Sequence, residues 1–251
     1  HNISTVARQV NGDWRLNGQK TYISGVEDAD AILVVARTGV DESTGRGLLS
    51  LFLVEVDSPG LSKQHIPTVV EAPEKQWSLF FDDVVVPDDQ LLGERDRGLA
   101  VVFDGLNPER IAAAVMCTGI ARYGLDKATR YANERAVWKR PIGTHQGLSH
   151  PLAEAKINLE TARLMVRHAA ALYDAGAPAG EAANIGKFAA AEAGIRALDQ
   201  SIQTHGGNGF AREYDLASYY WMVRLLRTAP VSREMILNYV AEHSLGLPKS
   251  Y

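Results

Sequence analysis

The strongest constraint on the fold is a change of hydrophobic pattern near Gly98. Before this residue, apolar runs of strand length alternate with turn signals, and no helix of ordinary length fits between them. After it, proline and glycine are sparse inside long segments whose apolar residues recur every three or four positions. This order predicts an α+β protein: a mainly antiparallel β-domain over residues 1–97, followed by a C-terminal four-helix bundle over residues 98–251.

The expected elements follow from local signals in each part. Asn17-Gly18 lies between two strand-like stretches and predicts a hairpin turn within residues 14–23. Apolar or β-branched runs predict further strands in a sheet, sandwich or partial barrel. An apolar stripe after Gln146, ended by Gly176, predicts one long helix. The strands are expected at 31–36, 48–56 and 77–86, and the other helices at about 109–134, 180–205 and 231–244.

Composition excludes several classes of function. The net charge is −4 and basic residues are mixed with acidic ones, which does not favour a nucleic-acid partner. No apolar run approaches the roughly 20 residues that cross a bilayer, so we expect no membrane span. No export signal follows His1, and we expect a cytoplasmic protein, although a targeting signal could lie upstream. The single Cys117 and the scattered histidines predict no metal site.

Three segments could carry chemistry, and each has a structural alternative. Glycines at 206, 207 and 209 follow a long helix, where they could form its C-terminal cap or let a ligand approach the backbone. Arg135 near a helix end could complement the helix dipole or bind an anion. His145 and Gln146 open the next helix, where capping is again sufficient.

Glu109 and Arg110 follow Pro108 at the expected start of the first long helix. A carboxylate in a first turn complements the helix dipole, which is the structural explanation for Glu109. The functional alternative is a general base, because a carboxylate that a bound substrate desolvates can take up a proton near neutral pH.

Several segments occur in a specific order: NGQKTYIS at 17–24, FFDDVVVP at 80–87, LLG at 91–93, Glu109-Arg110, Arg135 with Pro141-Ile142 and Gln146, and GGNGF at 206–210. In order and spacing, this succession resembles the acyl-CoA dehydrogenase family across nearly the whole chain. The resemblance implies a middle β-domain joined to a C-terminal four-helix bundle, an FAD cofactor and an acyl-CoA substrate. It implies an oxidoreductase in which a carboxylate removes the α-proton and the β-hydrogen leaves as hydride to flavin N5, giving the trans-2-enoyl-CoA.

The same resemblance assigns residues and partners. Arg110 matches a position near the acyl-CoA. Cofactor sites shared between subunits imply a homodimer or homotetramer, and the implied electron acceptor is an electron-transfer flavoprotein. The residues that match FAD-binding positions are Tyr22, Ile23, Ser24, Arg135, His145, Gln146, Gln203, Gly206 and Gly207.

Two departures from the family pattern matter. The family usually places its catalytic glutamate about twenty residues after the glycine segment, where this chain has Pro230. A minority places the base on the first bundle helix, directly before an arginine, and Glu109 fits that location. The resemblance also implies an N-terminal helical domain and the start of the β-domain ahead of His1. A fragment without them is expected to bind FAD poorly and to be inactive.

Two alternatives stay open at this point. One is a flavin monooxygenase or oxidase of the same fold, because such enzymes keep the bundle and vary the base. The other is a non-catalytic remnant that only oligomerises, which Pro230 favours and Glu109 opposes.

Overall fold

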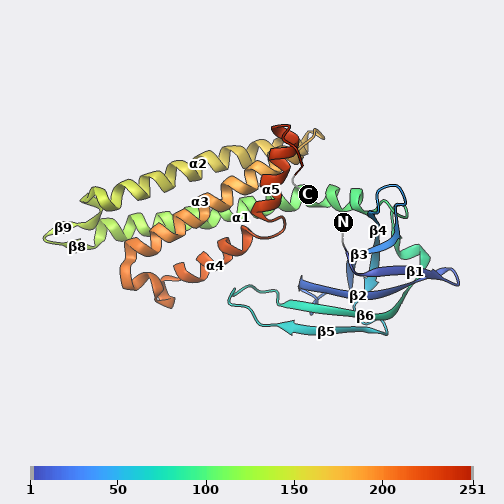
Figure 1. Ribbon diagram of the computed structural model, residues 1–251. Helices are drawn as coiled ribbons and strands as arrows, with labels where there is room; N and C mark the ends of the chain where they lie inside the picture. Colours follow the sequence, from blue (N-terminus) through green and yellow to red (C-terminus); the bar gives the residue numbers. More distant parts are fainter. Residues whose placement is uncertain (1–2, 250–251) are drawn as a thin grey trace. The chain divides into compact units, whose positions relative to one another are not determined.

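The computed structural model describes residues 3–249, without the side chain of Asp104. These residues form two compact units, one ending at Gly105 and the other beginning at Leu106 (Figure 1). The first unit is a sheet and the second is helical, so the prediction of an α+β fold is confirmed. The domain boundary predicted after residue 97 stays a proposal.

The first unit contains a seven-stranded sheet with the order β5-β6-β2-β1-β3-β4-β7. All neighbouring strands are antiparallel except β1 and β3, which are parallel. The core on this sheet is built around Trp14, Leu16 and Phe52, with ring centroids of Trp14 and Phe52 5.3 Å apart. The strands are β1 (Val6–Val10), β2 (Asp13–Ser24), β3 (Ala31–Val40), β4 (Gly47–Glu55), β5 (Leu61–Ile66), β6 (Gln76–Val86) and β7 (Leu91–Leu92).

The hairpin predicted at Asn17-Gly18 is wrong. These residues lie inside the continuous strand β2, at an irregularity in its pairing with β6. Gly18 is required there because its φ is 134° and a Cβ would lie 2.7 Å from the Cα of Thr5. The turn between β1 and β2 is formed instead by Asn11-Gly12, both with positive φ, as a two-residue hairpin turn requires.

The second unit is a bundle whose helices share one alanine-rich core. The first helix was predicted to begin at Glu109 but begins at Gly98 and continues through Pro108, so Glu109 is not in a first turn. The short helix α4 was not predicted. No helix within residues 3–249 is long and apolar enough to cross a membrane. The helices are α1 (Gly98–Glu134), α2 (Gln146–Asp174), α3 (Gly180–His205), α4 (Leu216–Leu226) and α5 (Arg233–Tyr239), with a small sheet of β8 (Ala136–Val137) and β9 (Arg140–Pro141) between α1 and α2.

Helices α1 and α3 lie side by side in a constant register. Arg110 donates a hydrogen bond to Asn184, a Cβ on Gly124 would lie 3.2 Å from Leu198, and Tyr131 stacks on His205. In each pair the two positions differ by 74 residues, so the helices run parallel over 21 residues, or about 32 Å at 1.5 Å per residue. Small residues permit this close approach, and the register fixes which side chains of the two helices meet.

Lys187 is a buried cation in the middle of this packing, only 1% exposed. Its ammonium donates hydrogen bonds to the carbonyl oxygens of Arg227, at 3.2 Å, and Val231, at 2.6 Å. Burial lowers the pKa of Lys187 from 10.5 to about 8, because the charged form loses its hydration. Lys187 therefore ties the segment between α4 and α5 to α3.

This buried lysine predicts a specific pH dependence of stability. Above about pH 8 the folded chain releases the Lys187 proton while the unfolded chain retains it, up to the ordinary pKa of 10.5. The free energy of unfolding should therefore rise by about 1 kcal/mol between pH 8 and pH 9. Urea unfolding of the wild type and of Lys187→Met, which has no charge to titrate, should show this rise only in the wild type.

The thiol of Cys117 limits the pH range in which this effect of Lys187 can be measured. Burial raises the pKa of Cys117 from 9.0 to about 12, so above about pH 9 this thiol makes the free energy of unfolding fall as the pH rises. An equal rise in Lys187→Met would show that another group is responsible.

Candidate functional site

Tyr22 lies in a β-bulge near the end of β2, and the predicted residues Ile23 and Ser24 directly follow this bulge. Between Lys20 and Ile23, β2 has one residue more than the paired strand β6. Tyr22 has a φ of 59°, and its side chain is 67% exposed. A tyrosine with positive φ is uncommon, and bulges often redirect a side chain beside a functional site. The bulge therefore directs the Tyr22 ring to the surface rather than to the core, and its role in cofactor binding stays a prediction.

The neighbouring residues fix this bulge. Ile23 packs against the core, and the Ser24 hydroxyl exchanges hydrogen bonds with the side-chain amide of Gln76 across the strands. Beyond it, the indole of Trp77 donates a hydrogen bond to Glu27 at 2.6 Å. These contacts hold the strand end in one conformation.

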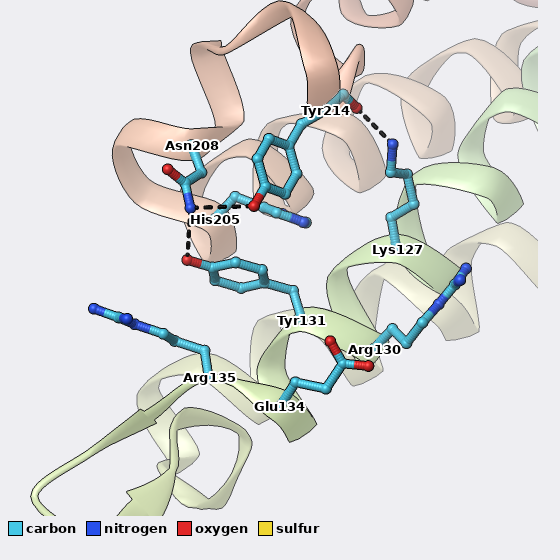
Figure 2. Close-up of a pocket in the computed structure, with 8 residues that line it drawn as sticks. All are labelled: Lys127, Arg130, Tyr131, Glu134, Arg135, His205, Asn208 and Tyr214. Carbon is cyan, nitrogen blue, oxygen red and sulfur yellow. Dashed lines mark hydrogen bonds between the residues drawn. The ribbon is translucent and has the colours of Figure 1, made fainter.

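The second unit contains a pocket where the ends of α1 and α3 meet (Figure 2). Its volume is about 420 Å³. Arg135 is the one predicted site residue among those that line this pocket. Asn208, which lies between Gly207 and Gly209, lines it as well. The other lining residues were not predicted, although their spacing of three and four on α1 is a helical stripe. The lining consists of Lys127, Arg130, Tyr131, Glu134, Arg135, His205, Asn208 and Tyr214.

An aromatic wall closes one side of this pocket. Tyr131 stacks on His205 with ring centroids 4.3 Å apart, and Tyr214 meets both rings edge-on. The side-chain amide of Asn208 donates to the hydroxyls of Tyr131, at 3.2 Å, and Tyr214, at 3.4 Å (Figure 2). The end of α3 is therefore joined to the last turns of α1 through side chains.

The charge in the pocket is mainly positive. Lys127 is paired with Asp215 at 3.1 Å, but within residues 3–249 no ion pair or side-chain hydrogen bond is found for Arg130 or Arg135. Burial, helped by the nearby Lys127 ammonium, lowers the pKa of His205, although the hydrogen bond between this ring and the Ser201 carbonyl at 2.7 Å acts in the opposite direction. The guanidinium of Arg135 is thus free to bind an anion.

The three glycines beside the pocket differ in their φ angles and in what an added side chain would contact. Gly206 caps α3 with a φ of 60°, as the capping explanation predicts. A Cβ on Gly209 would lie 2.6 Å from the carbonyl oxygen of Ile202, so packing excludes one. Gly207 has neither a positive φ nor any atom within 4 Å of a Cβ. The space above Gly207 is open, which suits a ligand that approaches the backbone.

The remaining predicted cofactor residues lie at the surface around these helix ends. Gln203 is exposed on the last turn of α3. His145 is the N-cap of α2, but its side chain makes no capping hydrogen bond and meets Trp138 edge-on at 5.9 Å. Gln146 is exposed at the first position of α2. Side-chain capping by His145 is therefore excluded, whereas ligand binding by these residues stays a prediction.

Glu109 and Arg110 are neighbours on α1 with opposite environments. Glu109 is exposed, whereas Arg110 is 5% exposed and donates three hydrogen bonds within the helical unit. Both lie near residue 184 of α3, far along the bundle from the pocket at residue 205. No group of three or more His, Cys, Asp or Glu side chains in the described part of the chain could hold a metal.

The comparisons with known proteins agree with this architecture. The model of the acyl-CoA dehydrogenase C-terminal domain matches residues 96–245, and that of the middle domain matches residues 1–84. Acyl-CoA dehydrogenase FadE12 of Mycobacterium tuberculosis is 49% identical over 100% of this chain and 65% of its own length.

Two solved structures are also similar. A glutaryl-CoA dehydrogenase in complex with glutaryl-CoA has a TM-score of 0.91 and 31% identity, covering 99% of this chain and 63% of that one. The FAD complex of PigA has a TM-score of 0.92 and 26% identity, covering 98% and 64%. The chain thus spans less than two thirds of the length of each relative.

Substitution of Gly209 and of Gly207 by alanine should have different effects on stability. Gly209→Ala should lower the free energy of unfolding by about 1–3 kcal/mol, because the methyl group overlaps the Ile202 carbonyl. Gly207→Ala should change it by less than about 1 kcal/mol, because the added methyl group meets nothing within the chain. Urea unfolding of both variants tests this, and a large loss of stability in Gly207→Ala would show that the glycine is structural.

Proposed function

This chain belongs to the acyl-CoA dehydrogenase family. From this premise we propose that, in a protein that also supplies the family's N-terminal helical domain and the start of its β-domain, it oxidises an acyl-CoA thioester to the trans-2-enoyl-CoA with FAD. The observation that carries the proposal is Glu109, an exposed carboxylate on α1 directly before a buried arginine. Position 230, where the family resemblance places the usual base, holds a proline that cannot accept a proton. Glu109 is therefore the residue of this chain proposed to act as the base.

Glu109 would remove the α-proton of the bound thioester. A carboxylate in water is too weak a base for this proton, so the acyl chain must displace water from around it when it binds. The exposure of Glu109 fits this role, because within residues 3–249 its carboxylate is found in no ion pair or side-chain hydrogen bond. FAD, when bound, supplies the acceptor for the β-hydride.

The chain's own residues fit an FAD at two places. In the first unit, the exposed ring of Tyr22, with Ile23 and Ser24, offers a flat surface beside a flavin ring. In the second, Arg135 and the open backbone at Gly207 suit a diphosphate. We propose that the cofactor also contacts His145, Gln146, Gln203 and Gly206.

The length of the bundle supports a shared cofactor site. Glu109 and Tyr131 are 22 positions apart on α1, which is about 33 Å. A dinucleotide held at the Arg135 pocket therefore belongs to another active site than the one containing Glu109 of the same chain. We propose a homodimer or homotetramer in which this pocket serves a neighbour's FAD, with an electron-transfer flavoprotein as acceptor.

Glu109→Gln should abolish the reaction while the protein retains its fold and flavin. Removing a general base typically costs 100-fold or more, so acyl-CoA-dependent dye reduction should fall at least about 100-fold. The matched control is Glu154→Gln on α2, an exposed ion-pair residue whose loss of charge should leave the rate unchanged.

Three other results of these activity measurements would contradict the proposed reaction or the proposed base. Full turnover by Glu109→Gln would remove Glu109 from the mechanism. Flavin that is reduced by acyl-CoA but then reoxidised rapidly by oxygen would favour an oxidase or monooxygenase of the same fold. Protein that oligomerises without any flavin absorption would favour the non-catalytic alternative.

A further inference from the structure

A groove with a positively charged lining lies between α1 and α2. Its volume is about 280 Å³, and it shares no lining residue with the pocket at Arg135. Three of the side chains that line it are arginines, Arg122 of α1 and Arg163 and Arg167 of α2. Positive charge is therefore concentrated at this place on a chain whose net charge is −4.

The arginines of this groove are only partly neutralised. The Arg163 guanidinium donates to both carboxylate oxygens of Glu160 at 3.1 Å, but the same carboxylate also accepts a hydrogen bond from Lys156. In the part of the chain that the structure describes, no ion pair or side-chain hydrogen bond is found for Arg122 or Arg167. Two guanidinium groups without an internal acceptor thus line the groove.

This arrangement of charge does not favour the stability of the helices. Arg163 and Arg167 are four positions apart on α2, and like charges at this spacing destabilise a helix. Arg122 lines the same groove from α1, so a third positive charge adds to the repulsion. A bound anion would replace this repulsion by attraction.

Gly119 of α1 also lines this groove, and the packing of the chain does not explain it. A Cβ at Gly119 would have no atom within 4 Å, and its φ does not lie in the left-handed region. Glycine in the middle of a helix costs stability relative to alanine. What glycine does provide is room for a ligand to approach the helix backbone. This glycine is therefore a second, independent observation that points to an occupant.

We propose that this groove binds a phosphate group over Gly119, between Arg122 and Arg167, either as the free ion or as part of a small phosphorylated molecule. A phosphate group carries a charge of about −1.5 to −2 at pH 7, which two guanidinium groups match. Each guanidinium can donate two parallel hydrogen bonds to phosphate oxygens. The volume of about 280 Å³ is at the small end for a ligand pocket, which suits a phosphate with a few more atoms. The site goes beyond the proposed dehydrogenation, which uses none of these residues.

Calorimetric titration of the purified protein with inorganic phosphate, at constant ionic strength, tests this site. Arg122→Gln and Arg167→Gln should each weaken phosphate binding at least about tenfold, because each removes a charge-assisted hydrogen-bond donor. Arg122→Lys should bind with an intermediate affinity, since an ammonium keeps the charge but not the planar fork. Gly119→Leu should abolish binding by filling the groove. Both arginines are exposed, so their variants should unfold at the same urea concentration as the wild type.

Two control variants leave this groove unchanged. Arg196→Gln removes an equal charge from α3, where Arg196 is paired with Glu154, and should leave the phosphate affinity within about twofold of wild type. Arg135→Gln should also retain the phosphate site, which distinguishes it from the proposed cofactor pocket. Glycerol phosphate that binds more tightly than inorganic phosphate would support a phosphorylated molecule as the occupant, and the reverse order would support the free ion.

Two results would overturn the proposal. One is a wild-type protein without saturable phosphate binding. The other is equal binding by the wild type, Arg122→Gln and Arg167→Gln, which would show an adventitious ion only. Full phosphate binding by Glu109→Gln is expected whether or not that variant is active, so failure of the proposed reaction is distinguished from failure of this site.

Discussion

The helical unit depends on the close approach of α1 and α3 in one register. A Cβ on Gly124 of α1 would lie 3.2 Å from Leu198 of α3, and one on Gly194 of α3 would lie 3.4 Å from the Cys117 carbonyl oxygen of α1 and 2.7 Å from Val223 of α4. Interiors are packed too tightly to absorb such groups without rearrangement. The core also lacks large side chains at most α3 positions, where alanine predominates. Small residues thus bring the helix axes together, and dispersion between backbones stabilises the bundle.

This register separates two groups of predicted site residues along one pair of helices. Near the start of the shared stretch, Arg110 and Asn184 hold the turn that carries Glu109. At its end, Tyr131 and His205 form a wall beside Arg135 and the glycine segment. A rigid pair of parallel helices keeps the two sites at a fixed distance. Under the proposed function, the base and the cofactor pocket of one chain contribute to different active sites of an oligomer.

Sequence patterns were sufficient for most of the fold but not for its irregularities. The strands predicted at 31–36, 48–56 and 77–86 and the long helices α2 and α3 have strong patterns, and their positions agree with the structure. The strands β1, β5 and β7 were not predicted. Asn17-Gly18 was misread because a bulge and a hairpin turn both require glycine with positive φ. Pro108 suggested a helix start, yet α1 tolerates it, since packing of later turns outweighs one lost hydrogen bond.

The site was less predictable, because it depends on contacts between distant residues. Arg135 and the glycine segment could be singled out by type, but only the register of α1 and α3 brings them to one pocket. His205 and Tyr131 are ordinary helix residues in the sequence, and nothing local marks their stacking. The burial of Arg110 was equally hidden, since an arginine after a glutamate usually lies at the surface.

The most direct test of this account is an anaerobic titration of the purified, flavin-containing protein with a panel of saturated acyl-CoAs. The account predicts that at least one of them bleaches the oxidised flavin absorption and yields the matching trans-2-enoyl-CoA in equal amount. A protein whose flavin absorption no acyl-CoA changes would contradict the proposed dehydrogenation.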